Sequence, residues 1–222
     1  MSFLLHPTRR LFVSLLAASL VGVGLFAVGA VRNQSFDFWY LSYNLVLALI
    51  PLLLAVTLQK LLKEQEWKRW LPLVVTFLWV LFLPNSFYIV SDFIHLQETP
   101  RADVVQDVVM LMQFSFMGLV FGFMSLFMVH REFIKRVSAK WAAPLVGALL
   151  FLSSFAIYLG RDLRWNSWDI IVQPFAIIAD IFDHIFHPIA HPEMGSITLS
   201  FFFMLASMYA VIWYTAAYRK RP

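Results

Sequence analysis

The sequence predicts an all-α fold: a polytopic transmembrane bundle of six spans, with one amphipathic interfacial or re-entrant helix before the last span. Composition is the first observation, because 61% of the 222 residues are hydrophobic, 14% are charged and the mean hydropathy is +0.75. A soluble domain of this size has about a quarter charged residues. The second observation is six stretches of 20 or more residues without Asp, Glu, Lys or Arg. Each is long enough to cross a hydrocarbon core of about 30 Å, which takes about 20 helical residues.

These stretches place the spans along one integral membrane domain that covers residues 1–222. The predicted spans are about 11–31, 38–59, 70–92, 106–129, 141–160 and 196–218, and the amphipathic helix is about 168–187. The stretches are continuously apolar instead of alternating, which favours helices over barrel strands. The first span follows the basic segment HPTRR. It is longer than the apolar core of a usual signal peptide, so we expect it to remain uncleaved.

The distribution of basic residues predicts the orientation in the membrane. The N-terminus, 60–69, 130–140 and the C-terminus together hold thirteen of the seventeen Lys and Arg residues. Cytoplasmic loops are enriched in Lys and Arg, so we expect both termini to be cytoplasmic. The opposite side holds ten of the thirteen acids and four of the six histidines. Because the basic residues lie in short loops next to spans, the net charge of +4 indicates topology, and we expect no nucleic-acid partner.

The third span ends in a polar stripe within FLPNSFYIVSDFIHL, residues 82–96. Its polar members include Asn85, Tyr88, Asp92 and His95. At about 100° per helical residue, these four fall within about 80° of one another. A carboxylate in a membrane is costly unless it faces a partner or water, so the stripe should face other spans. We expect Pro84 to kink the helix one turn before this stripe.

Further polar residues lie on the same predicted outer side, around the fourth and fifth spans. Asp103 and Asp107 are four residues apart and share one face at the start of the fourth span. The segment YLGRDLRWNSWD, residues 158–169, ends the fifth span. We expect the stripe to face Arg161, Arg164 or Asn166, which lie at the same depth. The predicted polar pocket comprises Asn85, Tyr88, Asp92, His95, Asp103, Asp107, Arg161, Arg164, Asn166 and Asp169.

The segment WDIIVQPFAIIADIFDHIFH, residues 168–187, is apolar but contains no charge-free run longer than ten residues. Such a run is too short to span a bilayer. On a continuous helix its polar residues share one arc of about 100°, which is typical of a helix lying on or dipping into the outer leaflet. These residues are Asp169, Gln173, Asp180, Asp183, His184 and His187. Pro174 should bend or begin this helix, and Pro188 and Pro192 should end it.

Two of these motifs resemble the bacterial membrane family called domain of unknown function 1361. The resemblance rests on FLPNSFYIVSDFIHL and YLGRDLRWNSWDI, which cover about an eighth of the chain, and on the number and spacing of the spans. The family pattern falls on Leu83–Asn85, on Asp92 with His95, and on Arg164–Asp169. The resemblance implies a multi-pass protein of the bacterial cytoplasmic (inner) membrane and implies no established activity.

Histidines and carboxylates at helical spacing suggest a metal site as one function. Asp180 with His184 and Asp183 with His187 are i, i+4 pairs, and Asp92 with His95 is an i, i+3 pair. Both spacings put two ligands on one helical face, as zinc sites of imidazole and carboxylate require. The candidate ligands of a divalent metal such as zinc are Asp92, His95, Asp180, Asp183, His184 and His187. A metal-bound water would allow hydrolysis of a lipid or envelope glycan.

Two other functions remain open beside the metal site. Arg161 and Arg164, flanked by Trp165 and Trp168, are suited to bind the phosphate of an anionic lipid headgroup. Alternatively, the polar residues only pack the bundle of a structural or accessory subunit. The chain contains no cysteine, which excludes thiolate ligands and nucleophiles. Whether the protein is an enzyme is not decided by its sequence.

Overall fold

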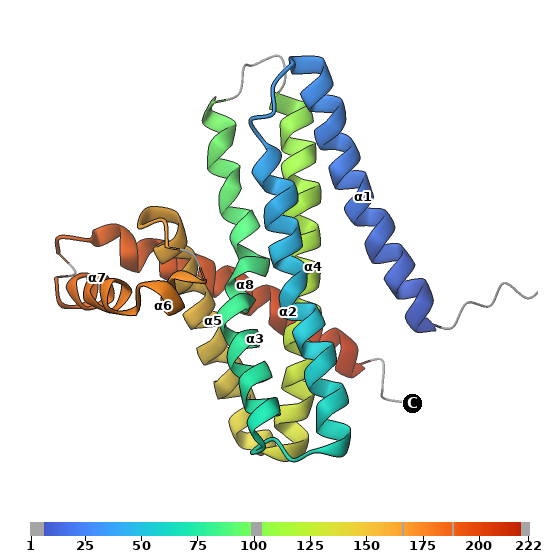
Figure 1. Cartoon of the computed structure of the whole chain (residues 1–222), viewed down its shortest axis with the longest axis vertical. Coiled ribbons are helices and arrows are strands. Elements are labelled where there is room, and N and C mark those ends of the chain that lie inside the picture. Colours follow the sequence, from blue (N-terminus) through green and yellow to red (C-terminus); the bar gives the residue numbers. More distant parts are fainter. Residues whose placement is uncertain (1–6, 99–103, 166, 188, 219–222) are drawn as a thin grey trace, which may run out of the picture.

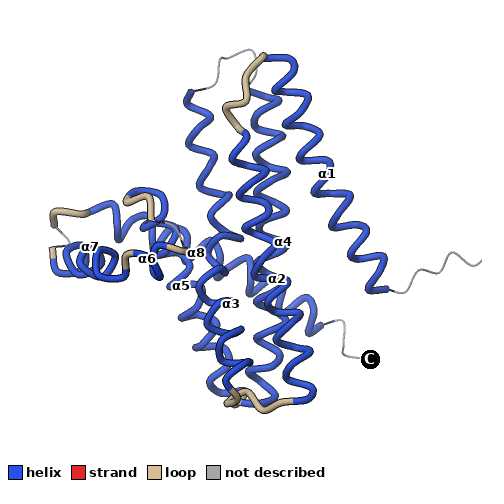
Figure 2. Tube along the Cα trace, viewed as in Figure 1, coloured by secondary structure: helices blue, strands red, loops and turns tan. Residues whose placement is uncertain are grey.

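Six helices of the described chain are long and apolar enough to cross a membrane, which confirms the predicted all-α class and number of spans. The structure is a computed structural model and describes residues 7–98, 104–165, 167–187 and 189–218. The helices are α1 (Pro7–Asn33), α2 (Trp39–Glu64), α3 (Trp70–Tyr88), α4 (Val104–Arg136), α5 (Ala139–Asp162) and α8 (Pro192–Tyr218). A 3₁₀ helix, η1 (Ile89–Glu98), continues α3. Figure 2 shows that loops are confined to the connections between helices.

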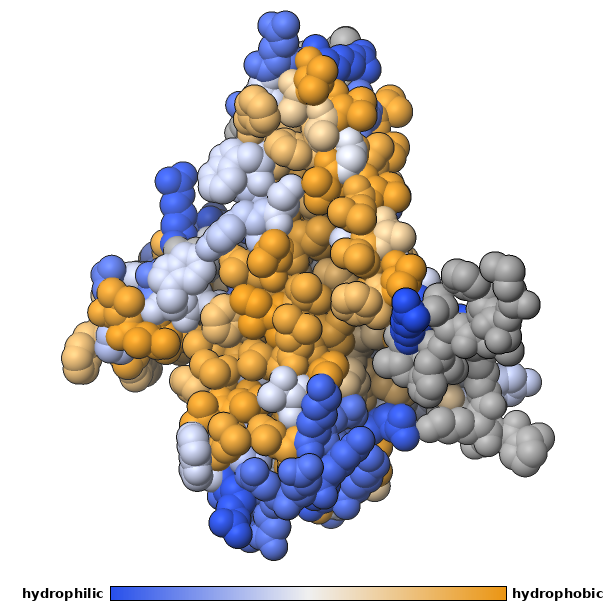
Figure 3. Space-filling view, turned by 45° about the vertical axis from the view of Figure 1, so that its right-hand side comes forward, coloured by the Kyte–Doolittle hydropathy of each residue, from blue (hydrophilic) through white to orange (hydrophobic). Residues whose placement is uncertain are grey.

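The helices α2, α3 and α4 run side by side along the long axis of the molecule (Figure 1). Helix α1 packs against α4, and α8 crosses behind the bundle and packs against α5. The α1–α2 connection and η1 lie at one end, called here the η1 end. The α2–α3 and α4–α5 connections lie at the opposite end, called here the α2–α3 end (Figure 1). On the face shown in Figure 3, hydrophobic side chains cover the middle, and hydrophilic side chains gather at both ends and along the left side of the view. A large apolar surface of this kind suits contact with lipid.

The third span does not keep the α-helical rotation on which the predicted stripe was based. Helix α3 ends at Tyr88, four residues after Pro84, and the chain continues as η1. A proline inside a helix removes a backbone donor and clashes with the preceding turn. A 3₁₀ helix has about three residues per turn, so Asp92 and His95 lie one above the other on η1.

The predicted amphipathic helix is two helices, α6 (Asp169–Val172) and α7 (Pro174–Phe186), which extend sideways from the bundle (Figure 1). The break is at Gln173, whose φ of −135° and ψ of 53° are not helical. The cause is Pro174, because proline pushes the preceding residue out of the α region and then starts a helix readily. The single arc predicted for residues 169–187 was therefore wrong at its N-terminal part, since Asp169 belongs to the other helix.

Two glycines allow α4 to approach α3 closely, and this contact positions the η1 end. A Cβ atom on Gly118 would lie 2.6 Å from the backbone oxygen of Ser86, and one on Gly122 would lie 2.5 Å from the ring of Phe87. Such small residues at i and i+4 are common where membrane helices pack. The Ser86 hydroxyl also donates to the carbonyl of Ala48 at 2.8 Å. Helix α3 therefore contacts both α2 and α4 at Ser86.

Candidate functional site

A cavity of about 450 Å³ lies between α2, α3, η1 and the segment from the end of α5 to α7. The stripe Asn85, Tyr88, Asp92 and His95 lines one wall. The remaining wall residues include four aromatic residues, two small polar residues and the apolar ends of α6 and α7. These are Trp39, Tyr40, Tyr43, Asn44, Trp165, Ser167, Ile170 and Ile177. The cavity therefore combines a polar wall with aromatic surfaces.

Asp92 is the most buried charged side chain of this cavity, with 2% of its surface exposed. Its Oδ2 accepts a hydrogen bond from Nδ2 of Asn44 at 3.1 Å. The Arg161 guanidinium acts electrostatically on Asp92 but donates its hydrogen bond to the backbone carbonyl of Ser91 at 2.7 Å. Asp92 thus keeps acceptor capacity beyond its bond from Asn44, because a carboxylate has about four acceptor sites.

Asn85 and Tyr88 join the stripe to the end of α5. Nδ2 of Asn85 donates to the hydroxyl of Ser167 at 2.9 Å, which leaves the Asn85 carbonyl oxygen as an acceptor. The ring of Tyr88 packs against Gly160, where an added Cβ would lie 3.2 Å from the ring. A larger residue at position 160 would require Tyr88 or the backbone of Trp165 to move.

One ring contact and one indole hydrogen bond connect the elements around the cavity. The rings of Tyr40 and His95 are 5.3 Å apart between centroids and are tilted by 58°. The indole nitrogen of Trp165 donates to Oδ2 of Asp180 at 2.8 Å, which ties α7 to the end of α5. The α6–α7 segment is thereby fixed as one side of the cavity through Ile170 and Ile177.

Four described residues of the predicted pocket, Arg161, Arg164, Asp107 and Asp169, are not part of the cavity lining. Arg164 is exposed and has a positive φ of 58°, and Arg161 is half-buried. Asp107 is buried in the first turn of α4, and Asp169 is half-buried at the start of α6. Asp103 and Asn166 lie outside the described residues. A phosphate site at Arg161 and Arg164 stays a prediction.

Asn44 donates a hydrogen bond to the stripe at Asp92, and the sequence analysis did not predict this contact. Asn44 lies on α2, whereas the expected neighbours of the stripe were on the fourth and fifth spans. A polar amide within a charge-free span was the signal that could have identified it, because such a group needs a hydrogen-bond partner in the membrane.

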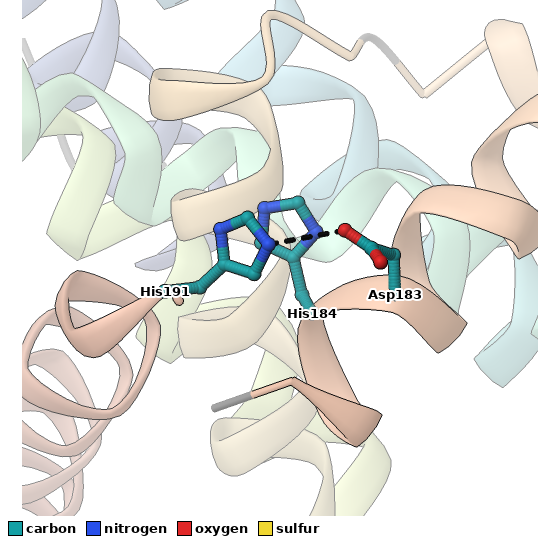
Figure 4. A group of neighbouring side chains, drawn as sticks. All are labelled: Asp183, His184 and His191. Carbon is teal, nitrogen blue, oxygen red and sulfur yellow. Dashed lines mark hydrogen bonds and ion pairs between the residues drawn. The ribbon is translucent and has the colours of Figure 1, made fainter. Parts of the chain in front are cut away.

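A cluster of histidines and one carboxylate lies where α7 leads into α8 (Figure 4). One potential ligand atom from each of Asp183, His184 and His191 lies within 4.8 Å of the others. The rings of His184 and His191 stack with centroids 3.6 Å apart. Nε2 of His191 is 3.0 Å from Oδ2 of Asp183.

The predicted metal ligands are only partly gathered in this cluster. His187 reaches Oδ1 of Asp183 with its Nδ1 at 2.9 Å. The Asp180 carboxylate accepts from Trp165 instead, and Asp92 and His95 belong to the cavity on α3 and η1. His191 was missing from the predicted ligands. Its signal was the succession of histidines at 184, 187 and 191 across the proline-rich connection.

Hydrogen bonds in the cluster act on the Asp183 carboxylate and orient the His184 ring. Those from His191 and His187 hold the pKa of the Asp183 carboxylate below its usual range. Nδ1 of His184 donates to the backbone carbonyl of Asp180 at 2.8 Å, which leaves Nε2 with a lone pair. Two imidazoles and one carboxylate are a donor set that suits zinc.

The fold and the position of its polar groups define a multi-pass membrane protein. The family model described as a protein of unknown function (DUF1361) matches residues 43–208, about three quarters of the chain. The chain belongs to this family, as the two motifs predicted. No curated protein and no solved structure matches the chain.

Proposed function

We propose that the cavity at the η1 end binds the polar headgroup of a membrane lipid. The observation that carries this proposal is Asp92, a carboxylate with 2% exposure that lines a cavity of about 450 Å³ beside a spanning bundle. A charge in this position is costly unless it has partners, and membrane carboxylates generally mark ligand or ion sites.

The cavity lining favours a headgroup with hydroxyl or amine donors. Asn44 donates a hydrogen bond to Asp92, and Asn85 donates one to Ser167. These two donors are therefore used within the protein. The remaining oxygens of Asp92 and Asn85 accept hydrogen bonds. The aromatic walls suit the apolar carbons of a sugar or glycerol, or an ammonium group that contacts an aromatic face.

The distribution of Lys and Arg supports an orientation with both termini in the cytoplasm, and we propose that the chain forms a single domain in the bacterial cytoplasmic membrane. The cavity then opens on the extracytoplasmic side. Such a protein presents or receives a lipid at the outer leaflet.

Lipid that copurifies with the protein tests this function. Mass spectrometry should find a bound polar lipid in the wild type, and Asp92→Asn and His95→Ala should retain much less of it. Loss of a hydrogen bond to a charged group costs about 1.5–3 kcal/mol, or roughly tenfold to a hundredfold in affinity. Asp37→Asn makes the same chemical change at an exposed site of the same end and should retain the lipid. Loss of stability in both variants, with no lipid bound to the wild type, would favour a purely structural role.

A metal site at Asp183, His184 and His191 is a second candidate, supported by the spacing of their ligand atoms. Asp183, His184 and His191 would hold a divalent metal such as zinc, and His191 would then give up the proton that it shares with Asp183. A fourth position open to water would supply the nucleophile for hydrolysis.

Metal analysis of the purified protein distinguishes this candidate. Wild type should carry about one equivalent of metal, and His184→Ala or His191→Ala should carry none. His187→Ala is the matched control, because it leaves the three clustered residues in place. A wild type without metal after incubation with zinc at neutral pH would exclude the site.

A further inference from the structure

A second polar cavity, of about 470 Å³, lies at the α2–α3 end between the last turns of α2 and α4. The described residues that line it are all polar, and they are Gln59, Lys63, Arg131, Glu132, Lys135 and Arg136. Four cations against one carboxylate make its lining strongly positive. It is therefore complementary to an anion.

Internal ion pairs use only part of this positive charge. Glu132, with 6% exposure, pairs with Lys135 at 2.6 Å and with Arg136 at 3.1 Å. Arg136 also donates to the carbonyl of Leu62 and so connects α4 to α2. Lys63 and Arg131 form no ion pair with any described residue, and they lie on different helices across the cavity.

An apolar groove of about 440 Å³ lies beside this cavity, between α4 and α8. It is lined by Phe116, Leu119, Val120, Phe123, Met124, Phe127, Met128, Met208, Ile212 and Ala216. Its last residue on α4 is Met128, whose carbonyl accepts a hydrogen bond from Gln59 of the cavity at 3.4 Å. Arg131 and Lys135 continue the face of Met124 and Met128, since residues three, four and seven apart share one side of a helix.

We infer that the groove and the basic cavity together bind one anionic phospholipid. Lys63 and Arg131 hold the phosphate, and an acyl chain occupies the groove between α4 and α8. Basic pockets between membrane helices are suited to acidic headgroups. Both groove helices are candidate spans, so their exposed apolar surface faces acyl chains. This site shares no lining residue with the cavity at the η1 end, so an experiment can contradict either proposal without affecting the other.

Native mass spectrometry in detergent, with phosphatidylglycerol or phosphatidylcholine added, tests the inference. Wild type should bind phosphatidylglycerol in preference to phosphatidylcholine. The double variant Lys63→Gln with Arg131→Gln should lose about fivefold in affinity for each cation removed. Lys68→Gln with Arg69→Gln removes the same charge from exposed residues of the same end and should bind like the wild type.

Two further measurements separate a lipid from a free phosphate. Ile212→Trp should narrow the groove and weaken phosphatidylglycerol binding, whereas Val211→Trp, at a neighbouring position with 67% exposure, should not. Inorganic phosphate at millimolar concentration should not displace the lipid. If the two double variants lost the same affinity for phosphatidylglycerol, the lipid would be held by diffuse electrostatic attraction. That result would overturn the proposed site. Displacement by phosphate, or no effect of Ile212→Trp, would overturn the lipid as its occupant.

Discussion

At the scale of single residues, the hydrogen bond from Asn44 to Asp92 joins α2 to η1 in the wall of the cavity at the η1 end. Removing one partner of a buried pair leaves the other without its hydrogen bond, whereas removing both can be nearly neutral. We therefore expect Asn44→Leu to lower the free energy of unfolding by roughly 1–3 kcal/mol. The double variant Asn44→Leu with Asp92→Leu should recover part of that loss. Thermal unfolding in detergent measures both, and strictly additive effects would contradict a direct interaction.

Because the pKa of Asp183 is lowered in the folded protein, we expect its contribution to stability to depend on pH. Its lowered pKa means that the folded protein favours the carboxylate. The stability it contributes is present above the pKa of the unfolded chain, about 3.9, and is lost as the pH falls through the lower folded pKa. Asp183→Asn should therefore melt below the wild type at pH 7, and the difference should disappear as the pH falls below about 4. If the two melting temperatures still differed at pH 2, ionisation of Asp183 would not be the source of the difference.

At the scale of helices, two glycines on α4 allow α3 and α4 to approach closely just before η1. A Cβ on Gly118 would meet the backbone of Ser86, which cannot rotate away as a side chain can. We expect Gly118→Ala to lower the free energy of unfolding by roughly 1–3 kcal/mol, the usual effect of overpacking. The measurement is the melting temperature in detergent.

Gly147→Ala on α5 is the matched control for Gly118→Ala. No atom lies within 4 Å of a Cβ placed there. Replacing an unconstrained helical glycine by alanine stabilises a helix by up to about 1 kcal/mol. The control should therefore melt at or above the wild-type temperature. Equal destabilisation by both changes would mean that the α3–α4 contact is not specific.

At the scale of the whole molecule, the proposed orientation can be measured directly. The loops at the α2–α3 end contain clustered Lys and Arg, which keep such loops in the cytoplasm. Reporter fusions after Arg69, Lys140 and Arg221 should be cytoplasmic, and fusions within 96–102 and 188–193 should be external. An external fusion after Arg221 would overturn the orientation and would require the α6–α7 segment to cross the membrane.

The amino-acid sequence was enough to predict the helical class, the number of candidate spans and the family. These depend on the length and apolarity of local stretches, which the surrounding fold changes little. The sequence also predicted that Asn85, Tyr88, Asp92 and His95 lie on one side of the third span, and all four line the same cavity.

The contacts that these residues make depend on how the helices pack in the tertiary structure. Periodicity does not show which helix packs against a face, so Asn44 on α2 was missed and Asp107 on α4 was included. The 3₁₀ helix after Tyr88 and the break at Gln173 changed the rotation of two predicted stripes. His191 joins Asp183 and His184 because the connection from α7 to α8 folds back, a contact that depends on the path of the chain through space.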